Sequence, residues 1–222
     1  MFDTIAHIII QYREGLISGI LVSLALVAIV WTTGLVFGVL FGWWAHQKKG
    51  VGSWLKVFWF LISSSPILVI LFWLHFPLQA MLGVVIKPFI TAAAGLSVVN
   101  IVFVAAIIKD SLDGLPKQYF IAGKVSGLSE KEIFTKIKFP LMMRAVIPQL
   151  LFLQVAMLQA TIFASLISVE EIFRVAQRIN SMIYKPVEIY TTLALFFIAI
   201  CLPLNVLAYW LKKTYTRNHS EK

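Results

Sequence analysis

The sequence has 222 residues, of which 60% are hydrophobic and only 13% are charged, and its formal net charge is +9. Soluble domains carry roughly a quarter of charged residues, so this composition excludes an ordinary soluble domain and indicates membrane-spanning helices. The single cysteine, Cys201, excludes a disulfide framework and a paired-cysteine metal or redox motif.

Five long apolar runs predict an all-α integral membrane protein with five spans, which form a single domain over residues 1–222. The runs lie at about 16–45, 54–78, 88–108, 141–169 and 187–211. Fourteen of the lysines and arginines fall on one side of this topology and five on the other. Because basic residues concentrate in cytoplasmic loops, we expect an external amino terminus and a cytoplasmic carboxyl terminus. The positive charge then reflects topology and contact with membrane lipid headgroups, and no nucleic-acid partner is expected.

The first two spans contain patterns that bear on packing. Gly34, Gly38 and Gly42 recur at every fourth residue and predict one helical face that allows close approach of another helix. The alternative is that glycine is simply common in membrane helices. In the second span, "SSSP" (63–66) predicts a break, because proline removes a backbone hydrogen bond that serine hydroxyls can compensate. This break either lines a passage or is a simple kink.

The third and fourth spans carry uncharged polar side chains at membrane depth. They are Asn100, Gln149, Gln154, Gln159, Thr161 and Ser165. Such groups face either a water-filled path or a neighbouring helix to which they hydrogen-bond. Ionisable residues are absent from the middle of the spans, which disfavours a proton- or sodium-coupled secondary transporter. The four histidines lie in ends and loops without metal-ligand spacing, which disfavours a membrane-embedded enzyme.

A polar cytoplasmic segment at about 109–140 separates the third and fourth spans. Residues 118–125 predict a short helix that stops at Gly127. Ser129 begins a second short helix through a capping box with Glu132, and Leu128 and Ile133 have the spacing of a hydrophobic staple. We expect Pro140 to close the second helix. The apolar faces of these helices favour docking either in the groove of a partner protein or on the membrane surface.

One motif in this segment resembles a known family signature. From Ile121 the chain reads "IAGKVSG", then nine residues, then "IKFP". This resembles the signature of permease subunits of bacterial ATP-binding-cassette importers, Glu-Ala-Ala, three residues, Gly, nine residues, Ile-x-Leu-Pro. Four residues match at the proper spacing, namely Ala122, Gly127, Ile137 and Pro140. Three depart from the pattern, namely Ile121, Gly123 and Phe139.

Within that superfamily the chain is most similar to the polar amino-acid uptake permeases, over about residues 15–213. The segments that carry this likeness are "SSSPILVIL" (63–71), "ATIFASLISVEEIFRVAQRI" (160–179) and "YKPVEIY" (184–190). The resemblance implies a bacterial inner-membrane pore made of two permease subunits, an extracytoplasmic amino-acid-binding protein, and a separate ATPase dimer that holds ATP and magnesium. This chain is then expected to carry no cofactor and to be no enzyme, and it lacks the phosphate-binding loop G-x-x-x-x-G-K-[ST].

The resemblance also implies which residues couple to the ATPase and which line the substrate pathway. Those expected to couple to the ATPase are Phe120, Ile121, Ala122, Gly123, Val125, Gly127, Leu128, Ser129, Ile133, Phe134, Ile137 and Pro140. Those expected along the substrate pathway are Ser64, Ser65, Gln154, Gln159 and Thr161. Positions that match polar segments of the family read Ile70, Ala106, Phe152, Leu153 and Ala160. Because a zwitterion needs polar partners, these departures predict a heterodimer with a sister permease. The alternatives are a homodimer for a less polar substrate, and a secondary transporter or channel.

Overall fold

The computed structural model describes residues 2–47 and 53–217, and every element in these ranges is helical. The elements are α1 (Phe2–Gln11), α2 (Arg13–Gln47), α3 (Ser53–Ser64), α4 (Ile67–His75), α5 (Pro77–Leu82), α6 (Pro88–Asp113), α7 (Lys117–Val125), α8 (Glu130–Ile133), a π-helix (Phe134–Lys138), α9 (Phe139–Ala160), a 3-10 helix (Thr161–Ile167), α10 (Ile172–Ile183) and α11 (Pro186–Arg217). The predicted all-helical fold class is therefore confirmed.

Four stretches of the described chain are long and apolar enough to cross a membrane: Arg13–Gln47, Pro88–Asp113, Glu130–Ile167 and Pro186–Tyr215. The remaining predicted span, 54–78, is broken. Its two parts, Lys56–Ser64 and Ile67–Leu82, bend by 107°. Pro66, with a ψ of 135°, stands between the two helices because its nitrogen cannot donate a helical hydrogen bond. The hydroxyl of Ser63 donates to the carbonyl of Trp59, one turn earlier.

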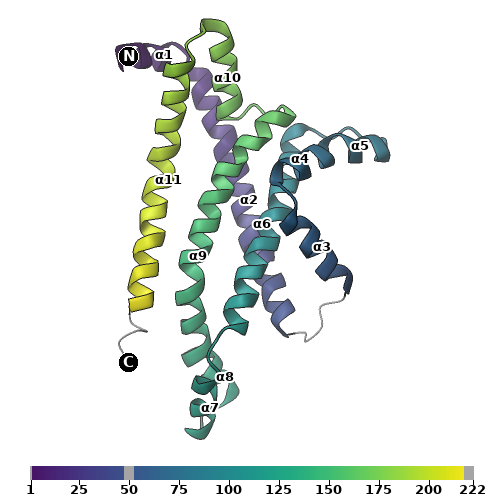
Figure 1. The fold of residues 1–222 in the computed structure, drawn as a ribbon, viewed down its shortest axis with the longest axis vertical. Helices are drawn as coiled ribbons and strands as arrows, with labels where there is room; N and C mark the ends of the chain where they lie inside the picture. Colours follow the sequence, from purple (N-terminus) through teal and green to yellow (C-terminus); the bar gives the residue numbers. More distant parts are fainter. Residues whose placement is uncertain (1, 48–52, 218–222) are drawn as a thin grey trace.

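The bundle is held together mainly by α2 and α6, which pack along their lengths (Figure 1). Gly34, Gly38 and Gly42 are all buried on the face of α2 that meets α6. A Cβ atom built on Gly42 would lie 2.6 Å from the carbonyl oxygen of Ala105 and 2.7 Å from Cβ of Ile108. The backbones of the two helices are therefore closer than any side chain on these positions would allow.

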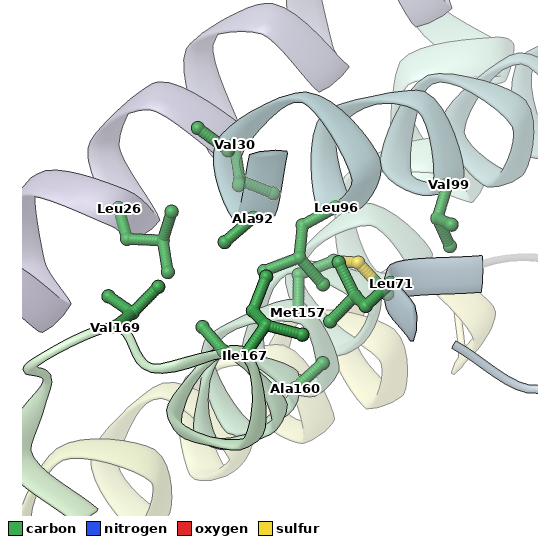
Figure 2. Packing of buried hydrophobic residues seen from close by; sticks show 12 residues of the cluster. Leu26, Val30, Leu71, Ala92, Leu96, Val99, Met157, Ala160, Ile167 and Val169 are labelled. Carbon is green, nitrogen blue, oxygen red and sulfur yellow. The ribbon is translucent and has the colours of Figure 1, made fainter. Parts of the chain in front are cut away.

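The largest apolar cluster joins α2, α4, α6, α9 and the 3-10 helix (Figure 2). Leu26 and Val30 of α2 face Leu96 of α6, and all three are fully buried. Leu71 of α4 and Ile167 of the 3-10 helix complete the contact. This cluster fixes the broken span against the bundle, because α4 has most of its contacts with α6 and the 3-10 helix.

Two groups of short helices mark the opposite ends of the bundle (Figure 1). Helices α1 and α10 lie at one end, close to the beginning of α11. Helices α7 and α8 lie at the other end, to which the last turns of α11 also point. The first and last described residues are therefore at opposite ends of the molecule.

Candidate functional site

The segment between α6 and α9 begins with α7, which ends in a tight left-handed turn. Gly127 has a φ of 77°, and its N–H donates to the carbonyl of Lys124 at 3.0 Å. The N–H of Leu128 reaches back to the carbonyl of Gly123, also at 3.0 Å. This pair of bonds is the Schellman arrangement, in which glycine adopts the left-handed conformation without steric cost. The turn fixes the direction in which the chain leaves α7.

Helix α8 starts at the capping box that the sequence predicts. The Glu132 N–H donates to the hydroxyl oxygen of Ser129 at 3.3 Å, and the Ser129 N–H donates to the Glu132 carboxylate at 3.1 Å. The same carboxylate pairs with Lys136 at 2.9 Å. Reciprocal capping satisfies two exposed amides and holds α8 at a defined angle to α7.

The structure differs from the expectation at Pro140. The second short helix does not end there but continues through the π-helix Phe134–Lys138 directly into α9. Pro140 lies in the first turn of α9, directly after the π-helix, whose last bond runs from the N–H of Phe139 to the carbonyl of Phe134; Pro140 itself has no N–H to donate such a bond. The segment is thus continuous with the membrane-spanning helix α9, and a movement of α8 acts on α9 without an intervening loop.

The residues that the sequence assigns to coupling separate into an inward and an outward set. Gly123 and Ile133 are buried, and Phe120, Phe134 and Ile137 are half-buried. A Cβ atom on Gly123 would lie 3.1 Å from Cγ1 of Ile133, so the absence of a side chain there lets α7 pack on α8. The outward set is Ile121, Ala122 and Val125; together with the exposed Tyr119, which the sequence did not assign to coupling, these residues form what we call the α7 outer face.

The α7 outer face is apolar and open. Val125 is 83% exposed, Ile121 64% and Tyr119 42%. An exposed apolar patch of this kind is typical of a contact surface for another protein or for the membrane interface. The packing of α7 on α8 involves the inward set, and the outer face is left exposed in this chain.

A ring contact connects this segment to α2, and polar contacts at the same end join α2 to the last turn of α6. The rings of Trp43 in α2 and Phe134 in the π-helix meet edge to face, with centroids 5.1 Å apart. Asp113, in the last turn of α6, accepts a hydrogen bond from Lys109 at 2.6 Å and contacts Nδ1 of His46 at the same distance. Among the spanning helices, α2 therefore contacts the segment and α9 continues from it, while Asp113 connects the end of α6 to α2.

A polar centre lies deep in the bundle, between α2, α6 and α9. The Asn100 amide donates to Oε1 of Gln154 at 3.0 Å and to the carbonyl of Val30 at 2.9 Å. The Gln154 amide donates back to Oδ1 of Asn100 at 3.2 Å, and Trp31 donates to the Gln154 carbonyl. Both amide side chains are buried, so they satisfy each other and join three helices.

The five residues that the sequence places along a substrate pathway lie in three different settings. Gln154 belongs to the buried amide pair, and Thr161 is buried with its hydroxyl bonded to the carbonyl of Leu158. Ser64 and Ser65 are located at the α3–α4 break. Gln159 is exposed and lines a cavity of about 560 Å³ between α9 and α11. The chain alone does not bring these residues into one site.

The sequence did not predict a functional position for Glu171, which lies outside the membrane-spanning segments. Its side chain is fully buried and caps α10 by accepting the N–H of Phe173 at 2.9 Å and of Arg174 at 2.8 Å. Ser23 of α2 donates to the same carboxylate and accepts the N–H of Ile172. Burial raises the pKa of Glu171 to about 7, although these hydrogen bonds oppose the shift. The only sequence signal was an acidic residue just before an amphipathic run.

Comparison with known proteins extends these observations to most of the chain. A family model described as "Binding-protein-dependent transport system inner membrane component" matches residues 34–217. The glutamine transport system permease protein GlnP of Escherichia coli (strain K12) is 27% identical over 178 residues, which cover 78% of this chain and 81% of that protein.

The probable glutamine ABC transporter permease protein GlnP of Bacillus subtilis (strain 168) is 30% identical over 173 residues, or 77% of this chain and 78% of that protein. A crystal structure of an amino acid ABC transporter with histidines has the same fold, with a TM-score of 0.82 at 20% identity over 93% of this chain and 96% of that one. The matched residues include the segment between α6 and α9 and the buried amide pair.

Proposed function

Because this chain belongs to the family of inner membrane components of binding-protein-dependent transport systems, we propose that it is a pore-forming permease subunit of an ATP-driven amino-acid importer. The observation that carries the proposal is the α7 outer face, an exposed apolar surface held rigidly at one end of the bundle. The relatives named as glutamine permeases support an amino acid as the class of substrate.

In this proposal the α7 outer face docks on a separate ATPase subunit, whose dimer holds ATP and magnesium. Closure of the ATPase moves α7 and α8 as one body, because the Schellman turn and the capping box fix their angle. The π-helix transfers the movement to α9, and the Trp43–Phe134 contact transfers it to α2. Alternating access follows when these helices rearrange at the substrate path.

The same proposal gives the chain an orientation. The end with α7 and α8 faces the cytoplasm, where the ATPase is, and the end with α1 and α10 faces an extracytoplasmic amino-acid-binding protein. The uneven distribution of basic residues supports this orientation.

We further propose that the pore is a heterodimer. Ala160 is buried in the largest apolar cluster, and Ile70 and Leu153 pack against that cluster. None of these side chains can pair with the charges of a zwitterion, and leaving such charges unpaired in a dry site is costly. A sister permease therefore supplies most substrate contacts, while this chain contributes Gln159 from the cavity between α9 and α11.

Reconstitution tests the proposal. The chain, the ATPase and the binding protein are placed in proteoliposomes with and without the sister permease, and uptake is measured over a panel of amino acids. We expect ATP-dependent uptake only when all components are present. Equal uptake without the sister permease would refute the heterodimer, and uptake that ignores ATP would refute the importer.

A further inference from the structure

The end of the bundle that carries α1 and α10 contains two adjoining cavities, which we call together the amphipathic groove. The apolar part, about 410 Å³, lies between α1, the first turns of α2, α10 and α11. The polar part, about 690 Å³, lies beside it, between the α1–α2 junction and α10. Arg13 and Ile179 line both parts, so the two cavities adjoin at these residues.

The lining of the apolar part is almost entirely aliphatic or aromatic. Ile5 and Ile8 come from α1, Ile172 from α10 and Ile189 from α11, and all four are buried. Arg13 and Thr192 are the only lining residues that are not apolar. The volume is in the range of small-molecule sites and is too narrow to admit a second helix with its side chains. An apolar chain without a polar backbone is therefore the kind of occupant that fits.

The polar part holds the charges that could select such an occupant. The Arg13 guanidinium is exposed and has no hydrogen bond or ion pair within the described residues. Arg178 also lines this part, where it pairs with Glu170 at 2.7 Å, and Glu14 is the acidic residue of the lining. A planar guanidinium presents two donors that match two oxygens of a phosphate. A phosphate group on Arg13 would give this guanidinium the partner that the described chain does not provide.

The position of α1 indicates where the phosphate comes from. This helix lies across the end of the bundle (Figure 1), with Ile5 and Ile8 facing inward and Ile9 and Ile10 exposed. A short helix with apolar residues on the outside at the end of a membrane bundle is typical of the lipid interface. At the depth of the lipid headgroups, the guanidinium of an arginine can pair with a lipid phosphate while its methylene groups remain in apolar surroundings.

We propose that the amphipathic groove binds one glycerophospholipid, with its phosphate on Arg13 and one acyl chain in the apolar part between α1, α10 and α11. The acyl chain then packs on the face of α10 that carries Ile172, Ala176 and Ile179, and it holds α10 against α2. The phosphate, shared by all glycerophospholipids, is the recognised group, so a lipid without it binds poorly.

A photoreactive phosphatidylglycerol, with the reactive group on its acyl chain, tests this site in lipid nanodiscs that contain the chain with its partner subunits. Mass spectrometry should find the label in peptides covering 5–20 and 189–196. Unlabelled phosphatidylglycerol should compete about fivefold more strongly than diacylglycerol with the same chains, which lacks the phosphate. Absence of label from these peptides, or equal competition by diacylglycerol, would overturn the proposal.

Two matched pairs of variants sharpen the test. Arg13→Gln should lower labelling about fivefold, whereas Arg174→Gln, at a partly exposed cation that does not line the groove, should leave it unchanged. Thr192→Phe fills the apolar part and should lower labelling on the order of tenfold, the equivalent of about two methylene groups. Its neighbour Thr191, replaced by Phe, should have no effect. Equal labelling of Arg13→Gln and Arg174→Gln, or of Thr192→Phe and Thr191→Phe, would overturn the proposal.

Discussion

Replacement of Gly34 by alanine tests the close packing of α2 on α6. A Cβ atom at this position would lie 2.1 Å from Nδ2 and 2.4 Å from Cγ of Asn100. Asn100 cannot move away freely, because its amide takes part in three hydrogen bonds with Val30 and Gln154. The added methyl group must therefore either separate the helices or break these bonds.

The expected cost follows from the two possibilities. Overpacking of a core costs about 1–3 kcal/mol, and each hydrogen bond lost between membrane helices costs about 0.6 kcal/mol. Either outcome predicts that Gly34→Ala lowers the free energy of unfolding by about 1–3 kcal/mol. Gly15→Ala in the same helix is the matched control, because the nearest atom, Cγ1 of Val175, is 3.6 Å away at ordinary contact distance. It should be neutral or slightly stabilising.

Equilibrium unfolding of the purified chain in mixed micelles measures the difference between the two variants. Asn100→Ala removes the two closest atoms of the clash, so the double variant with Gly34→Ala should be at least about 1 kcal/mol more stable than the sum of the single effects. Equal stability of Gly34→Ala and Gly15→Ala, or strict additivity in the double variant, would refute the reasoning.

Three further predictions concern Glu171, the topology and the apolar pathway positions. The pKa of Glu171 is raised to about 7 from 4.5, so the folded chain binds more protons than the unfolded chain between these values. Its stability should fall by up to about 3 kcal/mol as the pH rises through this window. Glu171→Gln should remove the slope in unfolding titrations at several pH values, and an unchanged slope would contradict this. A reporter fused at residue 110 should be cytoplasmic and one near Lys87 external, and the reverse result would overturn the orientation. Ala160→Asp should lower uptake, because the carboxylate enters a buried apolar cluster, and an increase in uptake would contradict the heterodimer.

The sequence predicted local features whose chemistry is complete within a few residues. The Ser129 capping box, the left-handed turn at Gly127 and the break at Pro66 depend only on neighbours in the chain, and the structure contains all three. The apolar composition of the long runs was likewise sufficient to predict the membrane class.

Features that depend on distant contacts were not predicted. Ser23 and Glu171 are 148 positions apart, so no local pattern indicated their hydrogen bond or the raised pKa. In a helix as short as α7, the periodicity could not say which apolar residues face α8 and which face outward. No residue composition is typical of a π-helix. Pro140 was therefore interpreted as the end of the second short helix, although the helix continues there into α9. The closed pairing of Gln154 with Asn100 also required the three-dimensional structure.

The central claim, that the α7 outer face couples this permease to an ATPase, is tested most directly by the number of amino-acid molecules taken up per ATP hydrolysed. Val125→Asp places a carboxylate on the outer face, where the side chain is 83% exposed. Val187→Asp, at 64% exposure in the first turn of α11, is the matched control at the opposite end. Proteoliposomes of the complete complex should show uptake per ATP reduced about tenfold or more in Val125→Asp, because docking would desolvate the charge, and unchanged in Val187→Asp. Wild-type uptake per ATP in Val125→Asp would contradict the account.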